Sequence, residues 1–100
     1  MSIPLSTINA AVAARPADPN ILDSLGWAYF KLSKYDQAEK YLVEASEKTK
    51  SATNFEHLGD LYDKLAKKDL ALTNWRKSLA LLTEPGDVAR LKSKIAASAK

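Results

Sequence analysis

A self-similarity at a spacing of 33 residues constrains the fold of this 100-residue chain more than any other feature of its sequence. Sliding the sequence along itself by this spacing superimposes residues that are identical or similar in size. The matched pairs are Leu25 with Leu58, Gly26 with Gly59, Tyr29 with Tyr62, Ala38 with Ala71, Leu42 with Trp75, and Ala45 with Ser78. A repeat of about this length predicts stacked copies of one supersecondary unit.

Helix start signals divide each copy into two helices. The chain has only three glycines and four prolines, and its many Ala, Leu and Lys residues favour helix over strand. Asp18 before Pro19 predicts a helix that ends near Leu32, and Asp36 lies in the first turn of a helix that ends near Lys48. In the second copy, we expect helices from Ser51 to about residue 65 and from about residue 69 to 82, and a last helix follows. The short connections predict that neighbouring helices run antiparallel.

A glycine in the middle of each first helix needs a physical reason, because it costs about 1 kcal/mol relative to alanine. Gly26 and Gly59 occupy the same repeat position. We expect both to allow close contact between the two helices of a hairpin.

The motif L-G-x-x-Y, followed at fixed spacing by Ala and a bulky residue, resembles the tetratricopeptide repeat family. The similar segments, within residues 19–82, are Leu25-Gly26-Trp27-Ala28-Tyr29, Tyr35-Asp36-Gln37-Ala38-Glu39-Lys40 and His57-Leu58-Gly59-Asp60-Leu61-Tyr62. The resemblance implies an all-α fold of antiparallel helical hairpins, stacked as a short right-handed solenoid with a C-terminal capping helix. It also implies that Ala38 or Ala71 is the small residue opposite the glycine in each hairpin. It divides one domain, 1–100, into the second helix of a partial repeat (4–16), two repeats (19–50 and 52–83) and the capping helix (84–98).

The resemblance also suggests a source and a role. One segment is similar to the closing repeats of long bacterial proteins of this family, many of which are exported or lipid-anchored. This segment is Ile21-Leu22-Asp23-Ser24-Leu25-Gly26-Trp27. Because the chain begins with half a repeat, we expect it to be an excerpt of a longer array. If that array belongs to an exported bacterial protein, we expect a soluble domain that is cytoplasmic or periplasmic, and the sequence itself leaves the compartment open. The family implies a protein-protein interaction scaffold, and from the residues we expect no enzymatic activity and no cofactor.

In the family, the first helices of successive repeats line a concave groove that binds a peptide or helix of a partner. The residues predicted to face this groove are Asn20, Asp23, Ser24, Trp27, Phe30, Lys31, Thr53, Glu56, His57, Asp60, Asp63 and Lys64. Four of them are carboxylates and two are lysines, whereas the whole chain carries a net charge of +3. The groove is therefore expected to be acidic on a basic protein.

Trp27 and Phe30 lie three residues apart on one helical face and predict an aromatic anchor for a partner. With the carboxylates, they point to a segment that carries Lys or Arg beside an apolar residue. The alternative is that the two rings pack against the partial repeat or a missing upstream helix. A ligand that ends in a carboxylate, as bound by heat-shock co-chaperones of the family, is disfavoured because Asp23, Glu56 and Asp60 would repel it.

The amino-acid composition argues against the common types of catalytic and metal site. The chain has no cysteine and a single histidine, which leaves no thiolate site and no His-rich zinc site. Adjoining turns of one helix carry Glu56, His57, Asp60 and Asp63. These side chains could share a metal ion, but a solvated acidic face is the simpler interpretation. The apolar residues are scattered and form no run of about 20 residues that would span a bilayer.

Uneven charge leaves two alternatives open. Residues 1–66 carry seven Lys or Arg and nine Asp or Glu, whereas residues 67–100 carry eight and three. The basic end would suit nucleic acid, although no aromatic residues alternate with the basic ones as stacking platforms, and a solubilising surface explains it as well. Self-association is the other alternative, through apolar surface around Ile8 and Val12 at the start of the array.

Overall fold

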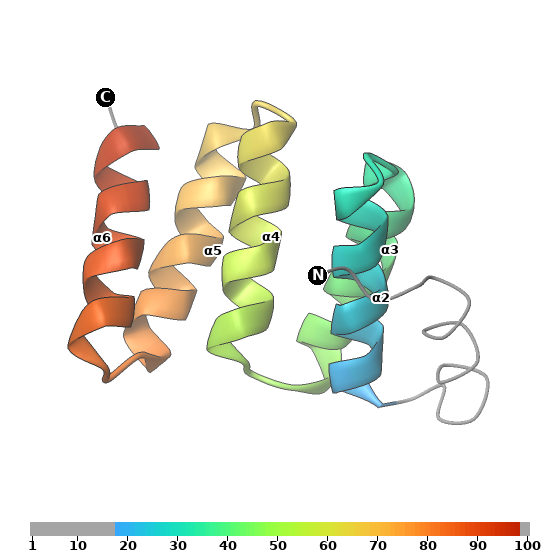
Figure 1. Ribbon diagram of the computed structural model, residues 1–100, viewed down its shortest axis with the longest axis horizontal. Coiled ribbons are helices and arrows are strands. Elements are labelled where there is room, and N and C mark those ends of the chain that lie inside the picture. Colours follow the sequence, from blue (N-terminus) through green and yellow to red (C-terminus); the bar gives the residue numbers. More distant parts are fainter. Residues whose placement is uncertain (1–17, 99–100) are drawn as a thin grey trace. The chain divides into compact units, whose positions relative to one another are not determined.

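The computed structural model describes residues 18–98 and shows five α-helices and no strand within them (Figure 1). The predicted all-α class is thereby confirmed. The predicted helix at 4–16 lies outside the described residues. The helices are α2 (Pro19–Lys31), α3 (Tyr35–Lys48), α4 (Ala52–Lys64), α5 (Lys68–Leu81) and α6 (Pro85–Ser98).

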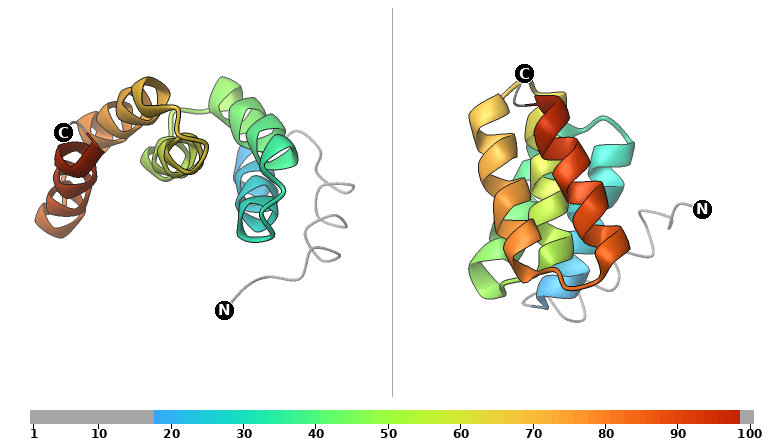
Figure 2. Two further views of the ribbon diagram at one scale, coloured as in Figure 1. Left: turned by 90° about the horizontal axis from the view of Figure 1, so that it is seen from above. Right: turned by 90° about the vertical axis from the view of Figure 1, so that its left-hand side faces the viewer.

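The chain divides into two compact units, and the boundary along the sequence lies between Thr49 and Lys50. In the first unit, α2 and α3 pack against each other as a helical hairpin. In the second, α5 packs closely against both α4 and α6 (Figure 2). Adjacent helices therefore pair closely, as in an all-α helical repeat.

Local capping interactions explain where the helices begin. The carboxylate of Asp18 accepts a hydrogen bond from the Asn20 amide at 2.9 Å, and Pro19 opens α2, where its missing N–H is not needed. The hydroxyl of Ser51 accepts from the Asn54 amide at 3.3 Å. The predicted starts of α2 and α4 are confirmed.

The turns inside the two hairpins repeat the same backbone conformation. Ser33 and Ala66, which are equivalent in the repeat, have φ of 60° and 61°, in the left-handed region. Directly after them, the Lys34 amide donates to the Tyr29 carbonyl at 2.9 Å and the Lys67 amide donates to the Tyr62 carbonyl at 2.8 Å. These bonds satisfy carbonyls at the helix ends, so the sequence repeat is also a structural repeat.

Gly26 and Gly59 lie where the two helices of each hairpin approach most closely. A Cβ built on Gly26 would lie 2.7 Å from Leu42 Cγ, and one built on Gly59 would lie 2.2 Å from Trp75 Cδ1. The expected close contact is present, but the nearest side chain opposite is the bulky residue and not Ala38 or Ala71. The glycine makes room for that bulky side chain, which is buried in both hairpins.

Apolar and small side chains on facing helices fill the core of each unit. In the first unit the buried residues are Leu22, Leu25, Ala38, Leu42 and Ala45. In the second, Phe55, Leu58, Leu61, Tyr62, Ala71, Trp75 and Leu91 are buried. Ser78 is also buried there, and its hydroxyl donates to the Ala52 carbonyl at 2.8 Å, which ties α5 to the start of α4.

The last helix, α6, is attached by few apolar contacts. Leu91 is its only fully buried side chain, and Val88 and Ile95 are half-buried. The side chains of Arg90 and Lys94 reach across to carboxylates of α4.

Candidate partner-binding surfaces

The twelve residues predicted to bind a partner are distributed equally between α2 and α4, and none of them is buried. We call the six on α2 the α2 surface and the six on α4 the α4 surface. The α2 surface consists of Asn20, Asp23, Ser24, Trp27, Phe30 and Lys31. The α4 surface consists of Thr53, Glu56, His57, Asp60, Asp63 and Lys64. They belong to different compact units and differ in chemistry.

Aromatic rings dominate the α2 surface. Trp27 and Phe30 stack with ring centroids 4.7 Å apart and planes inclined by 12°. Tyr35, at the start of α3, tilts against Phe30 with centroids 5.8 Å apart. The ammonium group of Lys31 lies 4.8 Å from the centroid of the Trp27 ring. Three rings from two helices thus form one partly exposed aromatic cluster beside a cation.

The helical register explains this arrangement. Residues three apart on a helix are neighbours, which brings Phe30 against Trp27. Asp23 lies one turn before Trp27 on the same helix and is partly exposed. The surface therefore offers flat apolar rings next to a carboxylate, a combination that suits a side chain with an apolar stem and a cationic head.

On the α4 surface, Glu56 binds two basic residues of α6. Arg90 contacts both of its oxygens, with Nε 2.9 Å from Oε2 and Nη2 2.8 Å from Oε1. Lys94 Nζ donates to Glu56 Oε2 at 2.7 Å. The Arg90 pair is bidentate, the geometry in which guanidinium and carboxylate groups bind most strongly.

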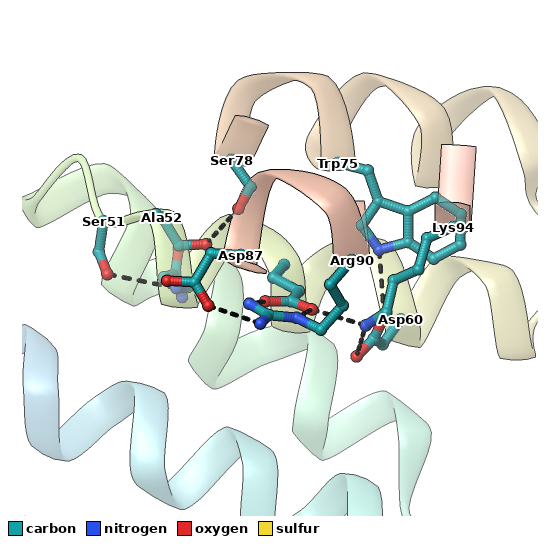
Figure 3. Close-up of polar contacts among 10 residues, drawn as sticks. Ser51, Ala52, Asp60, Trp75, Ser78, Asp87, Arg90 and Lys94 are labelled. Carbon is teal, nitrogen blue, oxygen red and sulfur yellow. Dashed lines mark hydrogen bonds and ion pairs between the residues drawn. The ribbon is translucent and has the colours of Figure 1, made fainter. Parts of the chain in front are cut away.

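Asp60 connects all three helices of the second unit (Figure 3). Its carboxylate accepts a hydrogen bond from the indole Nε1 of Trp75 in α5 at 3.1 Å. Lys94 of α6 donates to its two oxygens at 2.9 and 3.2 Å. Asp60 is therefore part of the internal structure of the unit and is not only a surface charge.

Two further contacts complete the polar interface between α4 and α6. Ser98 Oγ donates to Asp63 Oδ1 at 3.1 Å. Within α6, Arg90 Nη1 donates to Asp87 Oδ1 at 2.6 Å, which holds the guanidinium in place for Glu56. We call Glu56, Asp60, Asp87, Arg90 and Lys94 the ion-pair cluster.

The ionisation of these groups reflects the pairing. Hydrogen bonding from Arg90, aided by Lys94 and opposed by partial burial, lowers the pKa of Glu56 from 4.5 to about 2. The hydrogen bond to Glu56 also raises the pKa of Arg90. Burial lowers the pKa of Lys94, but its bonds to Glu56 and Asp60 outweigh burial, and the net shift is upward. All three groups are charged at neutral pH.

This pairing changes what the α4 surface offers to a basic partner. Of its three carboxylates, Glu56 and Asp60 are compensated by Arg90 and Lys94 of the same chain. Sequence reasoning did not identify these two basic residues as partners of α4. A signal was present, because the acidic and the basic pair are each spaced four residues apart, one helical turn on each helix.

Two other expectations concern metal ions and membranes. Within residues 18–98, no group of three or more His, Cys, Asp or Glu side chains is placed to hold a metal ion. The candidate metal residues include Glu56 and Asp60, whose carboxylates bind α6 instead. None of the described helices is long and apolar enough to cross a membrane.

Comparison with known proteins does not assign a family or a function to the chain. No family model matches the chain, and no curated protein matches it significantly. The repeat at 33 residues and the two surfaces described above are therefore the basis for assigning a function.

Proposed function

We propose that the chain is a tetratricopeptide-type interaction module that binds a peptide or helix of a partner protein through the α2 surface. The stacked, partly exposed pair Trp27 and Phe30 is the observation that carries this proposal. Large aromatic side chains contribute most of the binding energy at many interfaces, because they bury much area at little cost in side-chain entropy.

The partner segment is expected to carry Lys or Arg beside an apolar residue. The cation of Lys31 already lies over the Trp27 ring, which shows that this ring face accommodates a cationic group. Lys31 is exposed at the end of α2 and its side chain is free to swing out at small cost. A basic side chain of the partner would take its place over the ring, with Asp23 as its counterion.

The alternative of nucleic-acid binding through the basic end loses support from the ion-pair cluster. Arg90 and Lys94 face carboxylates of α4. Trp75, which shares Asp60 with Lys94, is buried and donates its indole N–H to that carboxylate, so it is not a platform for base stacking. The other alternative, self-association around Ile8 and Val12, involves residues outside the described part of the chain.

A peptide-array screen tests the proposal. The folded chain is compared with Trp27→Ala and with Asp23→Lys, and circular dichroism shows that each variant remains helical. Asp60 is unsuitable as a probe, because its substitution would also break the contacts with Trp75 and Lys94. We expect basic-apolar peptides to bind the parent chain and to lose binding to both variants.

Leu32→Ala is the matched control, because Leu32 is a large apolar residue that is 54% exposed just beyond the end of α2. It removes exposed apolar surface without touching the stacked pair. If Leu32→Ala lowers binding as much as Trp27→Ala, or if all variants bind like the parent, the α2 surface is not the site.

A further inference from the structure

The contacts between α6 and α4 have the form of a helix recognition site. Glu56 and Asp60 are one helical turn apart, with Asp63 beginning the next turn. Facing them, Arg90, Lys94 and Ser98 are spaced four residues apart on α6 and contact the three acidic residues in the same order. Each polar position on one helix thus has its counterpart on the other.

Few side chains of α6 are fully buried in the unit. One of its fourteen residues, Leu91, is fully buried, whereas α4 buries six of thirteen. Burial of apolar surface is the principal force that holds a helix to its neighbours, and exposed ion pairs add little to it. Arg90 is 45% exposed in its side chain and Lys94 is 29% exposed, so water reaches both. Consequently, α6 is held less firmly than α4 or α5.

We infer that α6 is an exchangeable occupant of the α4 surface, and that a partner helix with basic residues at positions i and i+4 and an apolar residue at i+1 binds there in its place. The pattern is that of α6 itself, in which Arg90, Leu91 and Lys94 contact the unit. This inference rests on the proposed function as a protein-binding module, and it names the partner class for the second surface.

The chemistry of the α4 surface restricts the occupant to a basic helix. With α6 displaced, Glu56 and Asp60 lose their basic partners, and an acidic or neutral segment would leave both charges uncompensated. The apolar position is defined as well, because Leu91 is 0% exposed and its displacement would uncover the surface against which it packs. A bidentate arginine at the first position fits Glu56 best.

An NMR titration of the whole chain tests the exchange. The isotope-labelled chain receives an unlabelled synthetic peptide with the sequence of residues 84–98. We expect α6 signals to shift toward positions typical of an unfolded segment as peptide is added, while α4 and α5 signals retain helical shifts. A peptide with glutamate at the positions of Arg90 and Lys94 is the control and should cause no change.

Two variants of the chain make the result quantitative. Arg90→Glu with Lys94→Glu repels α6 from Glu56 and Asp60, so the peptide should bind this variant about tenfold more tightly than the parent or better. Lys68→Glu with Lys92→Glu carries the same change of charge on exposed residues and should bind like the parent. If the reversed variant loses its helical circular dichroism, Arg90→Ala with Lys94→Ala serves instead.

The inference is overturned if the peptide leaves α6 signals of the parent unchanged at millimolar concentration, or if the variants gain no affinity. It is also overturned if the parent forms a dimer that exchanges α6 between copies, since a second copy would then be the occupant. Trp27→Ala should behave like the parent in this titration. The two proposals can therefore fail separately. Peptide binding on the array can be absent while α6 exchanges normally, or α6 exchange can be absent while the array peptides bind.

Discussion

The indole nitrogen of Trp75 donates a hydrogen bond to Asp60 Oδ1 at 3.1 Å (Figure 3). Gly59, which lies beside this bond, lets the ring approach α4. The equivalent pair in the first repeat is Leu42 and Trp27, in which neither side chain has a carboxylate to accept such a bond. The two hairpins thus share a glycine contact but use it differently. In the second unit, the contact also orients a carboxylate toward α6.

A double-mutant cycle tests this relationship. Trp75→Phe removes the indole donor and Asp60→Ala removes the acceptor. We expect their effects on the free energy of unfolding to be non-additive by about 1 kcal/mol, because each change alone breaks the same hydrogen bond. Urea denaturation of the four proteins measures the coupling. The cycle of Trp75→Phe with Asp63→Ala, which has no shared partner, should be additive; equal coupling in both cycles would contradict the assignment.

Alanine at Gly59 should destabilise the second unit. A Cβ there would lie 2.2 Å from Trp75 Cδ1, and the ring has little freedom to move because it is buried and hydrogen-bonded. Overpacking costs about 1–3 kcal/mol, and the gain of about 1 kcal/mol in helix propensity offsets only part of it. Thermal unfolding should show a clear loss of stability. Gly86→Ala, with nothing within 4 Å of the new methyl, should show none.

Glycine at Ala66 should stabilise the chain. Ala66 has φ of 61°, in the left-handed region that costs a residue with a side chain about 1–2 kcal/mol. Glycine removes that cost but loses more entropy on folding, so the expected net gain is about 0.5–1 kcal/mol. Ala89→Gly makes the same chemical change at an exposed residue inside α6, where glycine should destabilise by about 1 kcal/mol. The urea unfolding midpoints of the two variants should move in opposite directions. A shift in the same direction would show that the backbone at Ala66 is not strained.

The sequence indicated the helices more successfully than the contacts between them. The starts of α2 and α4 follow from local signals, namely the caps Asp18 and Ser51, which act within a few residues. The pairing of Glu56 with Arg90 joins residues 34 apart in sequence, and no local rule specifies it. The glycine contacts could be predicted in part. The repeat predicted a close approach of the two helices, but the large volume of Leu42 and Trp75 determines that these side chains lie against the glycines.

Acid should weaken the ion-pair cluster in a defined pH window. The pKa of Glu56 is about 2 in the folded chain and 4.5 when unpaired, so the unfolded state binds more protons between these values. Stability contributed by Glu56 is therefore present above pH 4.5 and is lost as pH falls toward 2. Because the pair is partly exposed, we expect a contribution of about 1 kcal/mol.

Comparison of the parent with Glu56→Gln at pH 6 and pH 3 measures this contribution. The parent should lose more stability on acidification than the variant, which cannot titrate at this position. Other carboxylates titrate in both proteins and cancel in the difference. An identical loss in the two proteins would show that the pair with Arg90 contributes nothing to folding.

Binding of a basic-apolar peptide at the α2 surface is the central claim, and a charge exchange measured by calorimetry tests it most directly. The peptide selected on the array is titrated into the parent chain and into Asp23→Lys, and the same is done with a peptide whose basic residue is replaced by glutamate. We expect Asp23→Lys to weaken the basic peptide about tenfold and to restore binding of the acidic one. If Asp23→Lys binds both peptides as the parent does, Asp23 is not the counterion and the proposed orientation of the partner on Trp27 is wrong.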